Sequence, residues 1–221
     1  MTLGEIKIEA LKLMFTNIND DIDEYNIAHY YDDENYKGYL YGMNGSINRC
    51  FGRLEERMVL PSKTQMLNTN DGKYPNSAFL RFNLDYLIND FYCIDRIVYE
   101  GKNGEYISDY DYMTEGNTLV LNPIKEGESY TVVYKPTIPR LKLSTPDDYD
   151  FSNKNNVDCV FIPDSIASII PYYIKGDLFR DDEPNEASES RNWFEQALNE
   201  ISYKAMSKAN TVKTIFSQTE V

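Results

Sequence analysis

Acidic side chains are the residues of this chain whose spacing could support chemistry. They gather in four short clusters, at residues 20–23, 32–34, 147–150 and 181–183. Two or three carboxylates that converge in a cleft can hold a divalent metal ion or act as a general acid and base in hydrolysis. Acids that are close only in sequence are more typical of solvated turns and of helix N-termini, which favour negative charge. The sequence therefore predicts that the chain is not an enzyme, and a metal-dependent hydrolase using these carboxylates is kept as an alternative.

Other catalytic and metal-binding residue types are sparse. His29 is the only histidine, so every Ser–His–Asp or Cys–His arrangement would have to use it. The three cysteines, Cys50, Cys93 and Cys159, are far apart and form no CxxC motif, which argues against a zinc site or a disulfide framework. Neither GxGxxG nor a GxxxxGK loop followed by Ser or Thr occurs, so no phosphate-binding loop is expected. We expect no metal and no cofactor.

Charge and hydropathy limit the partners of the chain. Its 221 residues carry a formal net charge of −14, whereas nucleic-acid readers need clustered Lys and Arg. With 42% hydrophobic residues the chain can bury a sizeable core. No apolar run approaches the ~20 residues of a membrane span, and the N-terminal segment lacks the pattern of a signal peptide. We therefore expect a soluble protein, made in the cytoplasm, with no membrane partner and no sequence-specific DNA binding.

Four segments have the apolar periodicity of amphipathic helices. Residues 2–15 begin with the Thr–Glu spacing of a capping box, and residues 36–58 repeat apolar side chains at steps of three and four. Residues 163–178 and 184–205 flank an acidic turn, and two helices joined by so short a turn should lie antiparallel. Pro171 lies inside the third segment, so that helix either bends there or begins near it.

Between these helical segments lie short runs with strand features. They cover residues 78–84, 92–100, 105–113, 118–122 and 129–136, and Gly-containing turns separate most of them. Residues 62–77 are polar and are typical of a loop.

The predicted fold class is α+β: a mainly α-helical bundle with an inserted small antiparallel β module and an extended C-terminal tail. The bundle is expected to comprise residues 1–61 and 162–208, and the β module residues 76–137. Residues 138–161 form a long connecting loop. Residues 209–221 form the extended tail, because the helical periodicity is lost there.

The order of these segments resembles that of head–tail connector, or adaptor, proteins of tailed bacteriophages. The likeness covers nearly the whole chain: a short N-terminal helix, the long helix "YKGYLYGMNGSINRCFGRLEERMVLP", a strand-rich insertion with "CIDRIVYE" and "SYTVVYKPTIP", and a return to helix at residue 162. In this family a helix ends in an acidic turn, and the next helix opens with Ala and carries Phe-Glu partway along. The matching residues are Asp181, Asp182, Pro184, Ala187, Phe194 and Glu195.

The resemblance implies a structural role in the virion neck, between capsid and tail. Family members are helical bundles, some with an inserted β module, that form a ring, usually of twelve copies, beneath the portal protein. The implied partners are further copies of the chain, the portal protein and other neck or tail-completion proteins. DNA would pass through the ring without being bound, which suits an acidic wall because like charges repel.

The C-terminal residues supply a further hypothesis. Val212, Ile215 and Phe216 are isolated apolar residues in a polar segment, and we expect them to dock on the portal or on an adjacent copy. A tail that docks on nothing is the alternative. The large insertion and the loop 137–161 exceed the simplest family pattern, which leaves open the layer of the neck that the protein would occupy.

A third class of function is a binding module. In that case the β insertion would hold a carbohydrate or a host protein through exposed Tyr106, Tyr110 and Tyr112. If residues 105–113 form one strand, these three side chains share a face, because alternate positions of a strand do. Ordinary packing of a tyrosine-rich sheet is the competing account.

Overall fold

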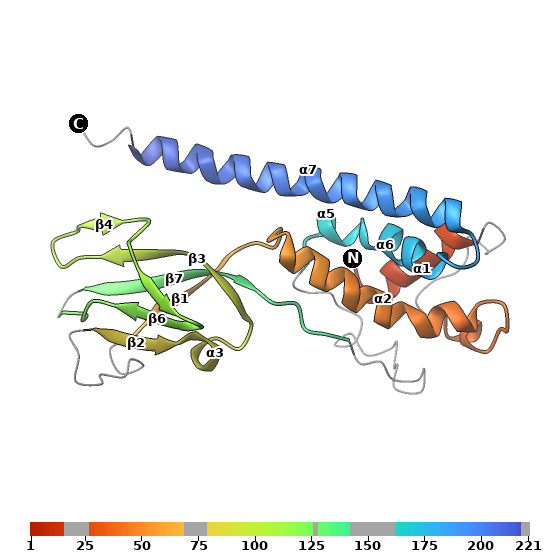
Figure 1. The fold of residues 1–221 in the computed structure, drawn as a ribbon, viewed down its shortest axis with the longest axis horizontal. Coiled ribbons are helices and arrows are strands. Elements are labelled where there is room, and N and C mark those ends of the chain that lie inside the picture. The colour runs from red at the N-terminus through yellow and green to blue at the C-terminus, as the bar shows by residue number, and fades with distance from the viewer. Residues whose placement is uncertain (16–26, 69–78, 126–127, 142–161, 218–221) are drawn as a thin grey trace. The chain divides into compact units, whose positions relative to one another are not determined.

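The structure is a computed structural model that describes residues 1–15, 27–68, 79–125, 128–141 and 162–217 (Figure 1). For residues 28, 29 and 205–217 it describes the backbone alone. The chain forms two compact units, one of residues 1–59 with 140–221 and the other of residues 60–139. We call them the helical unit and the sheet unit.

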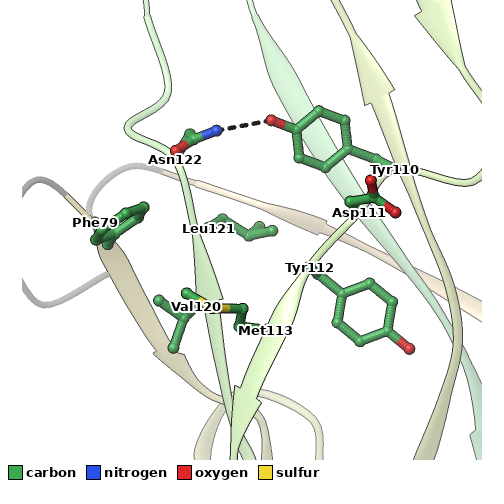
Figure 2. A pocket seen from close by; sticks show the side chains of 8 residues that line it. All are labelled: Phe79, Tyr110, Asp111, Tyr112, Met113, Val120, Leu121 and Asn122. Carbon is green, nitrogen blue, oxygen red and sulfur yellow. Dashed lines mark hydrogen bonds between the residues drawn. The ribbon is translucent and has the colours of Figure 1, made fainter.

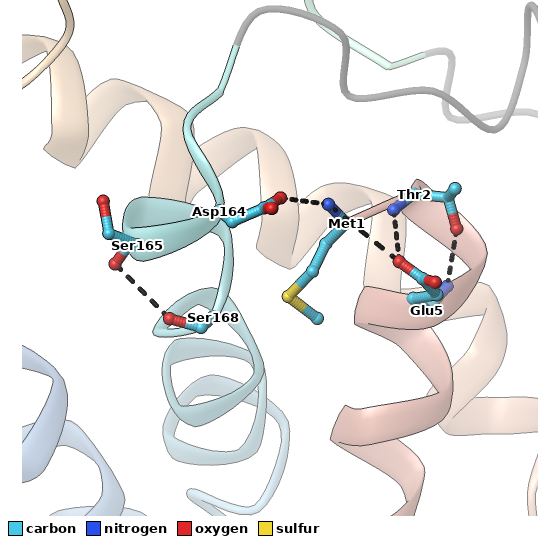
Figure 3. Close-up of polar contacts among 6 residues, drawn as sticks. All are labelled: Met1, Thr2, Glu5, Asp164, Ser165 and Ser168. Carbon is cyan, nitrogen blue, oxygen red and sulfur yellow. Dashed lines mark hydrogen bonds and ion pairs between the residues drawn. The ribbon is translucent and has the colours of Figure 1, made fainter.

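The helical unit begins with a capped helix. Its elements are α1 (Leu3–Met14), η1 (Ile27–Tyr31), α2 (Lys37–Glu56), α5 (Asp164–Ala167), α6 (Ile170–Leu178) and α7 (Pro184–Ser217). The Glu5 N–H donates to the Thr2 hydroxyl at 3.1 Å, and the Thr2 N–H donates to the Glu5 carboxylate at 2.7 Å (Figure 3). This confirms the capping box that the sequence predicted. The amino group of Met1 forms an ion pair with Asp164 at the start of α5.

Helix α6 is the centre of the helical unit, because α1, α2 and α7 all pack against it. Pro171 lies in its first turn, where the missing N–H would have had no helical partner. The helix therefore begins near the proline, which was one of the two predicted outcomes. Ile170 and Ile174 are fully buried and form the inner face of α6.

The chain leaves the helical unit after Val59 and returns at Arg140, and both ends of this excursion are held by α2. The Arg140 guanidinium donates two hydrogen bonds to the buried carboxylate of Glu55, one of them 3.0 Å long. The side-chain amide of Asn48 both donates to the Leu141 carbonyl and accepts from its N–H, each at 2.8 Å. These contacts fix the point at which the chain re-enters the helical unit.

The sheet unit contains two antiparallel sheets. Its elements are β1 (Lys63–Leu67), β2 (Leu80–Asn83), α3 (Leu84–Leu87), β3 (Phe91–Glu100), β4 (Tyr106–Ile107), β5 (Met113–Glu115), β6 (Thr118–Leu121) and β7 (Ser129–Pro136). The strand orders are β1-β7-β3-β4 and β2-β6-β5. Phe82, Ile97, Leu119 and Val132 are fully buried in a core that draws on strands of both sheets. The unit thus has a hydrophobic core of its own.

The predicted fold class was wrong in its weighting. The chain is α+β with about 46% helix and 23% strand in two antiparallel sheets, and it is not a mainly helical bundle. Strand β1 lies within residues 62–77, which were predicted to form a loop. The strand was not predicted because consecutive polar residues, Thr64 and Gln65, are both exposed and give no apolar alternation. Residues 105–113 were predicted as one strand, but only Tyr106–Ile107 is a strand before β5 begins.

The prediction of an extended tail at residues 209–221 was also wrong as far as Ser217, because α7 continues as a helix to that residue. The long loop 138–161 lies outside the described residues from 142 onward, as does the turn at residues 126–127.

A lysine is buried in α1. Lys7 is only 1% exposed, and its Nζ donates to the hydroxyl of Tyr31 in η1 at 3.3 Å. Burial lowers the pKa of Lys7 from 10.5 to about 7, because desolvation disfavours the charged ammonium. The unfolded chain therefore binds this proton more tightly than the folded chain.

We predict that the wild type gains stability over the Lys7→Met variant as pH rises. Between pH 7 and about 10.5 the unfolded state holds more protons on Lys7, so the free energy of unfolding increases with pH there. Urea unfolding followed by circular dichroism at pH 7 and pH 9 should show the difference between the two proteins shifting by about 2 kcal/mol toward the wild type. A difference that stays constant with pH would contradict a buried, deprotonatable Lys7.

Candidate functional site

The hairpin of α6 and α7 contains all the residues that carry the family resemblance, and a glycine sets its geometry. A Cβ atom on Gly176 would lie 3.0 Å from the Ala187 carbonyl oxygen and 3.1 Å from the Arg191 nitrogen, both backbone atoms of α7. Only glycine permits so close an approach without a shift of one helix. Ala187, which the resemblance singled out, is buried at this crossing.

The acidic turn of the hairpin is tied to α2. The Tyr39 hydroxyl donates to the Asp182 carboxylate at 2.6 Å. This hydrogen bond is the main cause that raises the pKa of Tyr39 to about 12. Asp181 is exposed and pairs with its neighbour Arg180 at 3.3 Å, and Pro184 is the first residue of α7. The turn residues therefore fix the hairpin on the helical unit and do not converge on a common point.

Phe194 and Glu195 attach α7 to its neighbours. Phe194 is fully buried and meets the ring of Tyr173 edge-on, with centroids 5.0 Å apart. The Arg53 guanidinium of α2 donates to both oxygens of Glu195 at 2.9 and 3.1 Å. These hydrogen bonds hold the pKa of Glu195 below its usual range. Arg57 adds an ion pair to the same carboxylate at 3.5 Å.

Sequence analysis missed a second ion-pair centre on α6. Asp177 is largely buried and pairs with Arg49 of α2, whose Nε lies 3.0 Å away, and with Arg191 of α7 at 3.5 Å. Its position next to Leu178, the last residue of an apolar helical stripe, gave no signal. Asp177 therefore links three helices through one carboxylate.

An exposed aromatic pair lies on the outer surface of the hairpin and was also missed. Trp193 of α7 is 50% exposed and stacks on Tyr172 of α6, with ring centroids 4.0 Å apart and planes at 25°. Large exposed aromatics are enriched in protein–protein contacts because they combine apolar area with a polar edge. The neighbouring positions of α7, from Ser188 to Asn192, are polar or charged.

The predicted docking residues lie in the last turns of α7. Positions 212, 215 and 216 belong to the helix, and their side chains lie outside the part of the chain that the structure describes. Their docking role stays a prediction.

The carboxylate clusters do not form a metal site in the described part of the chain. Residues 20–23 and 147–150 lie outside it. Asp33 accepts the Asn35 N–H at 2.9 Å, and Glu34 pairs with Lys37. Within the described residues, no group of three or more His, Cys, Asp or Glu side chains is placed to hold a metal ion. Among the same residues, no helix combines the length and the hydrophobicity that crossing a bilayer requires.

The sheet unit has a shallow hollow of about 160 Å³ beside the short strand β5 (Figure 2). Its lining comprises Phe79, Tyr110, Asp111, Tyr112, Met113, Val120, Leu121 and Asn122. Asn122 donates to the Tyr110 hydroxyl at 2.9 Å across one end. Phe79 and Met113 are exposed and contribute apolar surface.

The three tyrosines predicted to share one face do not all lie together. Tyr106 lies exposed on β4, whereas Tyr110 and Tyr112 both line the hollow. The ring of Tyr110 also packs against Tyr99 and Tyr130, each 5.3 Å away between centroids. The common face was predicted from a continuous strand, which residues 105–113 do not form.

Comparison of the chain with protein-family models and with curated proteins found no match.

The glycine crossing makes a prediction with a matched control. Gly176→Ala should lower the free energy of unfolding by about 1–3 kcal/mol, because the added methyl overlaps the backbone of α7. Gly38→Ala in α2 meets nothing within 4 Å and should raise it by about 0.5–1 kcal/mol, as Ala does in an open helical position. Chemical denaturation of both variants measures the effect, and equal changes would show that α6 and α7 are not in close contact.

Proposed function

We propose that the chain is a structural head–tail connector of a tailed phage, a subunit that repeats around a ring beneath the portal and provides a seat for the tail. Two observations support the proposal: the resemblance in the hairpin residues, and the contacts that these residues make. Asp182 and Glu195 attach the hairpin to α2, and Phe194 joins α7 to α6 within the hairpin. These contacts suit a wall element of a ring.

The observation that carries the proposal is the length of α7. Its 34 residues span about 51 Å, whereas the 9 residues of α6 span about 14 Å. The buried residues of α7 within the described side chains, Ala187, Ser190, Phe194 and Leu198, lie in its first half. A helix that runs so far beyond its partner within the unit offers a surface for neighbours, as assembly subunits require.

The electrostatics support the same function. A net charge of −14 disfavours retention of duplex DNA, since like charges repel and the protein releases few counterions. Under this proposal the partners are further copies, the portal protein and other neck proteins, and the location is the virion neck.

The hollow in the sheet unit favours a second candidate, a module that binds a carbohydrate or a host protein. Phe79 and Met113 supply exposed apolar surface, and Asp111 supplies a carboxylate for hydroxyl groups. Its volume is below the ~300 Å³ at which ligand pockets usually begin, so it suits a single ring or side chain. A glycan-array screen of the purified protein tests this candidate.

We predict a ring when the protein is expressed together with the portal protein encoded nearest to its gene. Electron microscopy of the purified complex should show a second ring of density stacked on the portal ring. The protein alone should not retard duplex DNA in a mobility assay at physiological salt, because the chain is strongly acidic.

Two results would refute the connector. One is a chain that stays monomeric and fails to co-purify with the portal protein. The other is hydrolysis of DNA or of glycans by the protein with Mg²⁺ or Mn²⁺, lost on chelation, which would return the metal-dependent hydrolase to first place.

A further inference from the structure

The two halves of α7 differ in charge. Residues 202–217 contain Lys204, Lys208 and Lys213 and no acidic residue. This segment therefore has a net charge of +3. Because the whole chain has a net charge of −14, the rest of the chain has a net charge of −17. We call residues 202–217 the basic segment.

The basic segment continues the inner stripe of α7. With 3.6 residues per turn, positions 18 apart fall on the same side of a helix. Position 212 thus follows Phe194 and position 216 follows Leu198, two buried residues of the first half. Since α6 is about 14 Å long, it ends well before these positions. An apolar stripe that outlasts its partner needs another surface.

The first half of α7 carries a surface of the opposite charge. Glu189, Trp193 and Glu200 are exposed and fall within an arc of about 40° around the helix. Trp193 stacks on Tyr172, so the arc has an aromatic centre between two carboxylates. We call this surface the acidic aromatic stripe. Its negative charge is opposite to that of the basic segment, and its aromatic rings offer apolar area to the apolar positions of that segment.

One helix cannot bring these two surfaces together. The acidic aromatic stripe and the basic segment lie on a continuous α7, with Trp193 and position 212 about 29 Å apart along the axis. The stripe can therefore meet a basic segment only from another molecule.

We infer that the basic segment of one copy docks on the acidic aromatic stripe of the next copy. This inference rests on the proposed function and names the contact between ring neighbours. In this contact the face of α7 that contains positions 212 and 216 lies on the surface formed by Trp193 and Tyr172, and the positive charge of the basic segment lies near Glu189 and Glu200. The contact is head-to-tail, so every copy has one donor end and one acceptor end, and such a contact closes a ring when the rotation between neighbours closes.

Charge reversal and its rescue test the contact in the full-length chain. The donor variant is Lys208→Glu with Lys213→Glu, and the acceptor variant is Glu189→Lys with Glu200→Lys. Sedimentation velocity at 50 mM NaCl should show the association constant of each double variant falling at least tenfold, because like charges then face each other. The quadruple variant restores opposite charges and should return to within about threefold of the wild type.

Two controls test whether the change in association comes from this contact. Lys102→Glu with Lys125→Glu changes the same charge on exposed positions of the sheet unit and should leave association unchanged. Trp193 is the only tryptophan of the chain, so its fluorescence reports on the acidic aromatic stripe itself. Its emission should shift to shorter wavelength as wild-type concentration rises, and 500 mM NaCl should reverse the shift.

Three results with the purified protein would overturn the inference. They are a wild type that stays monomeric from 10 µM to 1 mM at low salt, a folded quadruple variant that does not regain association, and a donor variant that loses affinity for duplex DNA while self-association persists. Rings on the portal formed by both double variants would also overturn it, and the proposed function would stand. Failure of the wild type to join the portal would refute the function instead.

Discussion

At Gly176 the backbones of α6 and α7 come so close that a Cβ atom would lie 3.0 Å from the Ala187 carbonyl oxygen and 3.1 Å from the Arg191 nitrogen. This crossing decides the rest of the helical unit. Because α7 lies against α6, Asp177 can reach arginines on both α2 and α7. The same proximity places Trp193 over Tyr172, which holds a large aromatic ring partly in solvent. The outer surface of the hairpin is therefore a consequence of a contact in its interior.

The insertion of the sheet unit is tolerated because each unit closes its own core. Phe82, Leu119 and Val132 are buried among other residues of the sheet unit, so this unit has a hydrophobic core of its own. Glu55 and Asn48, which lie on the C-terminal half of α2, bind the returning chain at Arg140 and Leu141. The returning end of the excursion is therefore fixed on the same helix from which the chain leaves.

Local signals in the sequence predicted local structure well. The Thr2–Glu5 capping box and strand β7 appear as predicted, since hydrogen bonds within a few residues and a run of β-branched and aromatic residues specify them. Strand β1 was missed because its pairing with β7 is long-range and leaves Thr64, Gln65 and Met66 exposed. Among the site residues, Asp182 and Glu195 were singled out by resemblance, and their partners Tyr39 and Arg53 could not be read from spacing.

The predicted extended tail was the error with the largest consequence for function, because α7 continues as helix to Ser217. Apolar residues become sparse after Ala205, which indicated an extended tail, yet positions 212 and 216 lie five full turns after Phe194 and Leu198. A head-to-tail contact between the two halves of such a helix has no built-in limit on copy number. Each added copy also brings a net charge of −14, so repulsion grows with the assembly. A template that fixes the rotation between neighbours and offsets this repulsion would decide between a ring and an open filament, and in the proposed function the portal is that template.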